Sequence, residues 1–218
     1  AERAYTEALE MRIAALGADH PDVGNLYKMR STARYRLGRM GEALADIEAA
    51  QARIPVDDDR YPGTLQNLGA IAIVQGDGDR AVRVLDDSYH LRVARHGPEH
   101  RASLADQAKW TEALLAYRPL IEGCAASEDA LDAKLAVYGE GHPELATTLA
   151  LRATCHRRRG DLERAEAALR DALAVMSGQE IGFRETLEGE LAELELLQGD
   201  PAAAVARTTA ALVEAEAI

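Results

Sequence analysis

The stretch GDLERA at residues 160–165 decides the fold, because it places Gly160 five residues ahead of Ala165 and this spacing recurs along the chain. The other instances of the glycine and alanine spacing are Gly38 with Ala43, Gly76 with Ala81, and Gly199 with Ala204. Gly76 and Gly160 lie 84 residues apart, which is two steps of 42, and the remaining steps are 38 and 39 residues long. A repeated interval of this size is typical of an array of supersecondary units. We therefore predict an elongated array in which each unit buries its apolar face against its neighbours.

A second marker lies in the loops, where a glycine precedes a histidine by three residues. Its three copies are GADHP at 17–21, GPEHR at 97–101 and GEGHP at 139–143. A glycine after a helical run supplies a left-handed end to that helix, and proline suits the first turn of the next helix. Each loop is therefore expected to end one helix and begin another. The repeat itself accounts for His20, His100 and His142, so these histidines do not indicate a metal site.

Helix-length runs separate these markers and, with a lone helix at 1–16, predict eleven helices. First helices of successive pairs are expected at 21–37, 60–75, 100–117, 143–159 and 182–198, and second helices at 41–54, 79–96, 119–138, 161–176 and 201–218. Sustained two-residue alternation is absent, which argues against strands. The predicted fold class is all-α, a right-handed α-solenoid of antiparallel helix pairs.

We interpret residues 1–218 as one repeat array. It comprises a half repeat at 1–16 and helix-pair repeats at 17–54, 55–96, 97–138, 139–176 and 177–218. Because residues 1–16 match a second helix, the chain opens within a repeat, and further units are expected upstream. The third pair has Arg118 and Pro119 where its turn should carry glycine, which predicts a kink or a wider angle within that pair.

Charge and composition narrow the classes of partner. The protein has 37 acidic and 25 basic residues and a net charge of −12, so it should repel nucleic acid. Nine acidic residues fall in 180–218 against Arg184 and Arg207, a field that favours a basic partner or, more simply, keeps the array soluble. Neither a membrane span nor a signal peptide is predicted. We expect no contact with a membrane.

Cys124 and Cys155 are the two cysteines, and their number and separation predict reduced thiols in a cytoplasm rather than a disulfide. Neighbouring residues on a helix point about 100° apart, so Cys155 and His156 are a poor nucleophile and base pair. We interpret Cys155 as a buried structural residue. The sequence lacks a phosphate-binding loop and a nucleophile elbow, and we predict no catalytic residues, metal, cofactor or small-molecule substrate.

The repeat resembles the tetratricopeptide repeat of kinesin-light-chain type. The resemblance depends on the His-Pro loops, on TLQNLG at 64–69, and most specifically on residues 16–21, 139–146 and 160–166. HEAT and armadillo units have similar lengths, but the glycine and alanine at the turn favour the tetratricopeptide repeat. The resemblance implies that the first helices of successive pairs line a concave groove for a peptide or a partner helix.

The groove stripe implied by the resemblance takes positions i, i+3, i+7 and i+10 of each first helix, which share one face. The residues on it are Asn25, Lys28, Thr32, Tyr35, Gly63, Gln66, Ala70, Ile73, Ala105, Ala108, Glu112, Leu115, Thr147, Ala150, Thr154, Arg157, Thr186, Gly189, Glu193 and Leu196. We interpret Lys28, Glu112, Arg157 and Glu193 as isolated charges that orient a partner. Asparagine is usual in the family where Lys28, Gln66, Ala108, Ala150 and Gly189 stand. Since Gln66 alone keeps an amide, docking of a helix or folded surface is favoured over an extended peptide.

The leading hypothesis is a non-catalytic scaffold that binds a protein or peptide, or another domain of its own chain, through this groove. Alanine- and arginine-rich arrays of this style resemble segments appended to bacterial signalling proteins such as serine/threonine kinases, which implies a regulatory or recruiting role. Two alternatives stay open. One is an oligomerisation module without a separate client, and the other is a cysteine-dependent enzyme.

Overall fold

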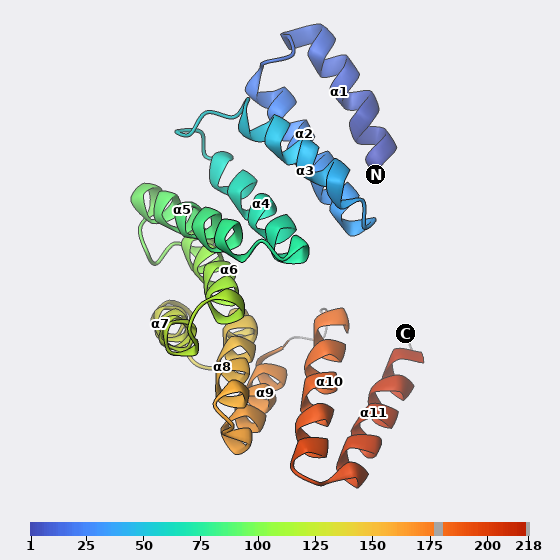
Figure 1. The fold of residues 1–218 in the computed structure, drawn as a ribbon, viewed down its shortest axis with the longest axis vertical. Coiled ribbons are helices and arrows are strands. Elements are labelled where there is room, and N and C mark those ends of the chain that lie inside the picture. Colours follow the sequence, from blue (N-terminus) through green and yellow to red (C-terminus); the bar gives the residue numbers. More distant parts are fainter. Residues whose placement is uncertain (177–180, 217–218) are drawn as a thin grey trace. The chain divides into compact units, whose positions relative to one another are not determined.

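The computed structural model describes residues 1–176 and 181–216, and this part of the chain folds into eleven α-helices and one short 3-10 helix, with no strand (Figure 1). The helices are α1 (Glu2–Leu16), α2 (Pro21–Arg36), α3 (Met40–Gln51), α4 (Tyr61–Gln75), α5 (Gly78–His96), α6 (Arg101–Tyr117), α7 (Leu120–Tyr138), η1 (Pro143–Leu145), α8 (Ala146–Arg158), α9 (Leu162–Val175), α10 (Ile181–Leu197) and α11 (Pro201–Glu216). The predicted all-α array of antiparallel helix pairs is confirmed.

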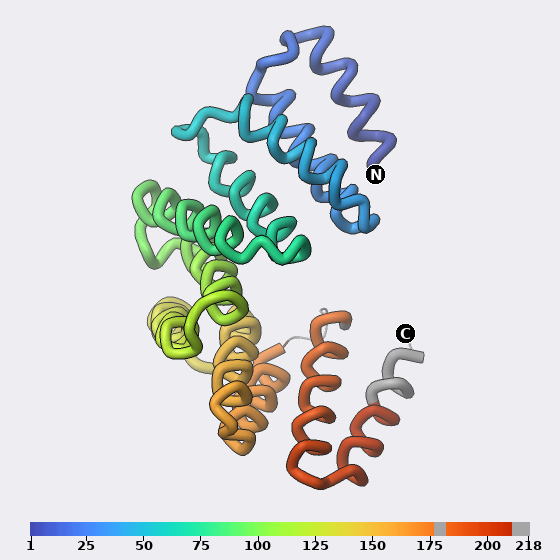
Figure 2. Tube along the Cα trace, in the orientation of Figure 1, coloured from blue at the N-terminus to red at the C-terminus, as the bar shows by residue number. Residues whose placement is uncertain are grey.

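Two compact units divide the protein, Ala1–Ala113 and Leu114–Ile218. In the first unit, α2 pairs with α3 and α4 pairs with α5, while α1 packs on α2 and α3 packs on α4. Figure 2 follows the backbone through these successive hairpins. Each pair therefore covers the apolar face of the pair beside it, which is how a repeat array builds a core.

The second unit repeats this plan. Its helix α8 pairs with α9 and α10 pairs with α11, while α7 packs on α8 and α9 packs on α10. Leu169, Leu187, Leu191 and Leu194 lie in its core. Residues 177–180 and 217–218 of the predicted last repeat lie outside the described residues, and 181–216 form the expected pair.

The glycine and alanine spacing marks the turn inside four of the five helix pairs, as predicted, and the third pair has Arg118 and Pro119 there instead. Gly76 ends α4 in the left-handed conformation with φ 75°, which costs a glycine little and most other residues much more. The partner alanines are buried, with exposed fractions of 0% for Ala43, Ala81 and Ala165 and 4% for Ala204. Because a methyl group is the smallest side chain that still excludes water, it lets the two helices of a pair approach closely.

The three loop histidines cap the first helices. The Nδ1 atoms of His20, His100 and His142 accept hydrogen bonds from the backbone N–H groups two residues later, at 3.1, 3.2 and 3.2 Å. The first N–H groups of a helix have no partner within the helix, so a side-chain acceptor placed there stabilises its start. The histidine in the repeated loop thus has a structural explanation in each of its three copies.

Helix boundaries deviate from prediction by three residues at two places. The second helix α3 ends at Gln51 rather than at residue 54, and α8 begins at Ala146, after η1, rather than at residue 143. Ile54 turns inward and is 2% exposed. A Cβ added to Gly24 would lie 2.8 Å from Cγ1 of Ile54, so α2 and this turn touch closely. Pro55 also disfavours helical geometry at the residue before it. The close contact of Ile54 with α2 and the proline at position 55 together explain why α3 ends early.

Candidate partner-binding face

The first helices α2 and α4 are joined by a polar link on the predicted stripe. Asn67 Nδ2 donates to Thr32 Oγ1 at 2.9 Å, and Thr32 Oγ1 donates to the carbonyl of Lys28 at 3.2 Å. Sequence reasoning selected Thr32 but passed over Asn67, because the spacing rule placed its neighbour Gln66 on the stripe. The other stripe residues here, Tyr35, Ala70 and Ile73, are partly buried.

Gln66 does not present a free amide to a partner. Its Nε2 donates to Asp106, a carboxylate that is only 1% exposed and also accepts from Ser88 Oγ at 2.6 Å and from Arg92 Nε at 3.4 Å. Burial raises the pKa of Asp106, while Ser88 and Arg92 act in the opposite direction. Asp106 therefore ties α4, α5 and α6 together. Sequence reasoning missed it, because a single aspartate in a helix resembles an ordinary surface residue.

The prediction of four isolated charges is wrong for three of them. Glu112 Oε2 lies 2.9 Å from Lys109 Nζ, and Arg157 Nη1 lies 3.5 Å from Glu193 Oε2. Lysine at i−3 of Glu112 sits one turn away on the same helix, whereas Arg157 and Glu193 are brought together by the packing of the second unit. These pairs neutralise charge that a partner was expected to meet.

Lys28 is different, since its ammonium group makes no hydrogen bond or ion pair with any residue in the described part of the protein. It is partly buried on α2 and faces α4. The point where a Cβ would stand on Gly63 lies 3.5 Å from Lys28 Nζ and 3.8 Å from Arg92 Nη2. Burial lowers the pKa of Lys28, as do the charges of Arg60 and Arg92, and Asp58 partly offsets them.

Arg60 lies beside this group but is already neutralised. Its guanidinium reaches Asp58 Oδ2 at 2.6 Å and Asp22 Oδ1 at 2.7 Å. Hydrogen bonds to Asp58, chiefly those from the Arg60 side chain, lower the pKa of that carboxyl to about 2. The guanidinium of Arg60 is therefore engaged by two carboxylates, and its charge still contributes to lowering the pKa of Lys28.

Two predicted stripe residues are too buried to meet a partner. Ala108 is 5% exposed and Leu115 is 2% exposed, and Leu115 packs in a cluster with Cys124 and Cys155. Exposed stripe residues of the second unit include Thr147, Gly189 and Glu193. Thr154 Oγ1 is occupied by the carbonyl of Ala150 at 3.1 Å. Asn25, in the first unit, has its side-chain Nδ2 at 3.9 Å from Met29 Sδ.

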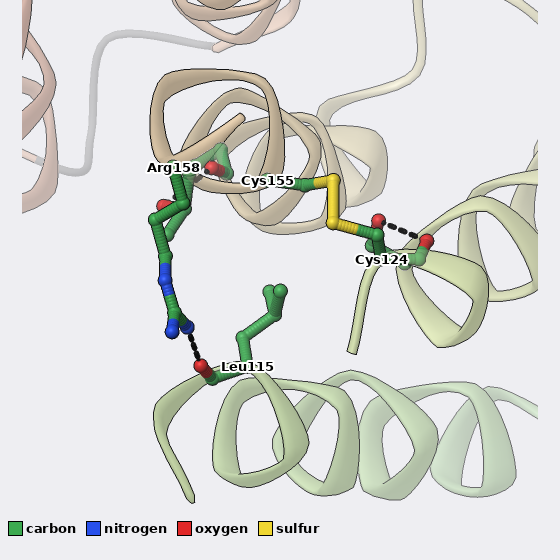
Figure 3. The surroundings of a disulfide bond; sticks show 7 residues. Leu115, Cys124, Cys155 and Arg158 are labelled. Carbon is green, nitrogen blue, oxygen red and sulfur yellow. Dashed lines mark hydrogen bonds between the residues drawn. A yellow bond between two sulfur atoms is a disulfide. The ribbon is translucent and has the colours of Figure 1, made fainter. Parts of the chain in front are cut away.

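The prediction of two reduced cysteines is wrong, because Cys124 of α7 and Cys155 of α8 form a disulfide (Figure 3). Their Cα atoms lie 5.4 Å apart although 31 residues separate them in sequence. Both cysteines are buried, and the guanidinium of Arg158 donates to the carbonyl of Leu115 beside them. Cys155 is buried and structural, as predicted. With both thiols in the bridge, the described residues offer no thiol nucleophile in this state. The cysteines therefore no longer support the predicted cytoplasmic location.

A cavity of about 670 Å³ lies in the first unit among α3, α4 and α5, away from the predicted stripe. Leu65, Leu68 and Val84 contribute apolar lining, and Arg83 and His90 contribute polar lining. Gln51, the last residue of α3, and Val56, in the turn that follows, line it as well. The sequence pattern of the stripe gave no sign of this cavity.

Residues 1–176 and 181–216 also lack the features of a metal site and of a membrane span. No group of three or more His, Cys, Asp and Glu side chains there is arranged to hold a metal ion. Within the same residues, each helix is too short or too polar to cross a bilayer.

The helix pairs, their turns and their capped loops define a tetratricopeptide repeat fold, and two segments match family models. Residues 119–177 and residues 1–22 each match a model described as tetratricopeptide repeat. The predicted array of tetratricopeptide repeats, with a fold of the kinesin-light-chain type, is thereby confirmed. No curated protein matches this sequence.

Solved structures share this fold at low sequence identity. BtubC (BKLC) from P. vanneervenii has a TM-score of 0.72 at 16% identity, over 99% of this chain and 88% of that one. The TPR-like repeats described as a putative kinesin light chain of Podosopora anserina give 0.68 at 17%, over 90% and 98%. A Rap protein complexed with competence and sporulation factor gives 0.77 at 13%, over 88% of this chain but 54% of that protein.

Proposed function

We propose that the protein is a non-catalytic scaffold that binds a protein or peptide through the first-helix faces of its units. The observation that carries this proposal is Lys28, a partly buried cation on α2 that lacks an acceptor among the described residues. Burying a charge without a partner costs free energy, so a group of this kind is better suited to recognition than to stability. The exposed small residues Thr147 and Gly189 would allow a partner to approach α8 and α10 closely.

The experiment is affinity capture from the source organism with residues 1–218, comparing wild type, Lys28→Glu and Arg83→Glu. Arg83 is a matched control, because it is exposed on α5, off the predicted stripe, and forms no ion pair within the described residues. We expect the same partner with wild type and Arg83→Glu and a loss of about tenfold or more with Lys28→Glu, since the change reverses a charge at the contact. Equal recovery by all three would contradict the proposal.

The wider setting is also a proposal. An array of this kind would recruit or regulate within a larger bacterial signalling protein, such as a serine/threonine kinase, and its partner would be another protein or another domain of the same polypeptide. The Rap protein offers a limited parallel, because it has this fold in a complex with competence and sporulation factor. We also propose a cytoplasmic location, which predicts that the Cys124–Cys155 disulfide is reduced in the cell.

Oligomerisation is the second candidate, favoured by the last repeat. Leu196, Leu197 and Val205 are 56%, 60% and 64% exposed on α10 and α11. Exposed leucine and valine side chains on these two helices could pack against another copy of the protein. Light scattering of the purified wild-type protein over a range of concentrations separates the candidates, because a monomer throughout excludes self-association.

A further inference from the structure

The cavity among α3, α4 and α5 has an apolar lining that comes from two helices and a turn. Its apolar residues are Val56, Leu65, Leu68, Val84 and Leu91. Leu65, Leu68 and Val84 are at most 7% exposed, whereas Val56 is 56% exposed in the turn after α3. The volume of about 670 Å³ falls in the range of pockets that hold small molecules. A small ligand with an apolar part would cover side chains that water now reaches.

Most polar side chains that line this cavity already have partners within the protein. Arg80 Nη2 lies 2.9 Å from Glu48 Oε1, and Gln51 Nε2 donates a hydrogen bond to the hydroxyl of Tyr61 at 3.2 Å. The Nδ1 atom of His90 lies 3.1 Å from a carboxylate oxygen one turn earlier on α5. These groups shape the cavity but are already satisfied in part or in full.

Arg83 and Asp87 are the exceptions. Both are exposed on α5 and line the cavity, and no hydrogen bond or ion pair joins either side chain to another residue in 1–176 or 181–216. They stand four residues apart, so they share one face of the helix with about 5–6 Å between their Cβ atoms. A cation placed before an anion at this spacing is the less favourable order for an ion pair within a helix. One positive and one negative group therefore line the same cavity without neutralising each other.

This pair of charges narrows the class of ligand. A simple anion would be attracted by Arg83 and repelled by Asp87, and a simple cation would meet the reverse. An uncharged apolar molecule would engage neither of them. An α-amino acid carries an ammonium and a carboxylate on one carbon, which matches two opposite charges one helical turn apart. Its side chain then extends over the apolar lining.

We propose that this cavity binds a free α-amino acid with a large apolar side chain. Arg83 binds the carboxylate, Asp87 binds the ammonium, and the leucine and valine side chains contact the apolar part. The amino acid is a ligand and undergoes no reaction here. The site contains no residue of the predicted stripe, so it does not depend on the proposed function, and Arg83→Glu remains a control for partner binding at Lys28.

The first test follows binding of phenylalanine by NMR of the wild-type protein with isotope-labelled valine and leucine methyl groups. We expect the signals of Val56 and Val84 to shift with a Kd of about 1 mM, while Val205 in the second unit stays unchanged. N-Acetylphenylalanine lacks the ammonium, phenylalaninamide lacks the carboxylate and glycine lacks the apolar side chain, so each should bind at least about fivefold more weakly. Absence of shifts with phenylalanine at about 20 mM, or equal binding of all four compounds, would overturn the site.

The second test assigns each charge of the ligand to its residue. Arg83→Met should bind phenylalanine about fivefold more weakly and should no longer prefer it to phenylalaninamide. Asp87→Asn should likewise lose its preference for phenylalanine over N-acetylphenylalanine. Arg36→Met and Asp132→Asn are exposed changes of the same kind away from the cavity and should bind phenylalanine as the wild type does. Variants at Arg83 and Asp87 that keep both preferences would overturn the site.

Discussion

Gly123 and Gly189 of the second unit show how strongly the effect of one added methyl group depends on its surroundings. A Cβ on Gly123 would stand 2.8 Å from Cα and 2.9 Å from the backbone N of Leu115, while a Cβ on Gly189 would meet nothing within 4 Å. Both glycines are helical, so they share the intrinsic cost of glycine in a helix. What differs is whether a neighbouring backbone must move.

We therefore predict opposite effects of alanine at these two positions. Gly123→Ala should destabilise the second unit by about 1–3 kcal/mol, because α6 and α7 would have to separate. Gly189→Ala should stabilise it by about 1 kcal/mol through helix propensity. Urea unfolding followed by circular dichroism measures both. Equal and small changes would show that the contact between Leu115 and Gly123 is looser than the structure indicates.

At the scale of the element, the repeated loop determines where first helices begin. In the fourth pair the cap belongs to η1, whose first residues include the N–H group that donates to His142 Nδ1. The pattern of glycine, histidine and proline could be read from sequence because every contact in it is local. The elements, their pairing and the buried alanines were predictable for the same reason.

Loss of this cap gives the second prediction. His142→Ala should destabilise the second unit by about 1 kcal/mol, because the backbone N–H of Glu144 loses its acceptor, and His142→Asp should restore most of the loss. His156→Ala, within α8 and away from the cap, is the matched control. Thermal unfolding compares the three variants. The cap would be unimportant if the Asp variant were no more stable than the Ala variant.

The candidate site was harder to predict than the elements. The spacing rule, applied to each first helix by itself, placed Lys28 of α2 and Gly63 of α4 on the stripe. Arg92 comes from α5, a second helix of its pair, and its approach to the stripe depends on packing between helices. The same applies to Arg157 with Glu193. Leu115 was predicted to face a partner but is buried, because the spacing rule does not take account of how neighbouring helices cover each position.

At the scale of the molecule, the two compact units differ in covalent structure, since the Cys124–Cys155 bridge lies in the second. Separation in sequence suggested two independent thiols, but helices of neighbouring repeats bring distant residues together. Cys124 lies near the start of α7 and Cys155 near the end of α8, and the packing of α7 on α8 aligns them. The positions of the two cysteines within their repeats, rather than their separation in sequence, would have indicated the disulfide.

Removing the bridge should lower the stability of the second unit. The bridge closes a loop across 31 residues, and the greater freedom of the unfolded state without it predicts a cost of about 3 kcal/mol for the double variant Cys124→Ser, Cys155→Ser. Dithiothreitol should lower the thermal midpoint of the wild type and leave that variant unchanged.

The single tryptophan, Trp110, lies in the first unit, so its fluorescence monitors that unit separately from circular dichroism. Because both cysteines are buried, alkylation of the reduced thiols should require prior opening of the fold, measurable as mass gain that accelerates with urea. Rapid alkylation of the native protein without reductant would show instead that the thiols are free, and an unchanged midpoint in dithiothreitol would show that the bridge contributes nothing to stability.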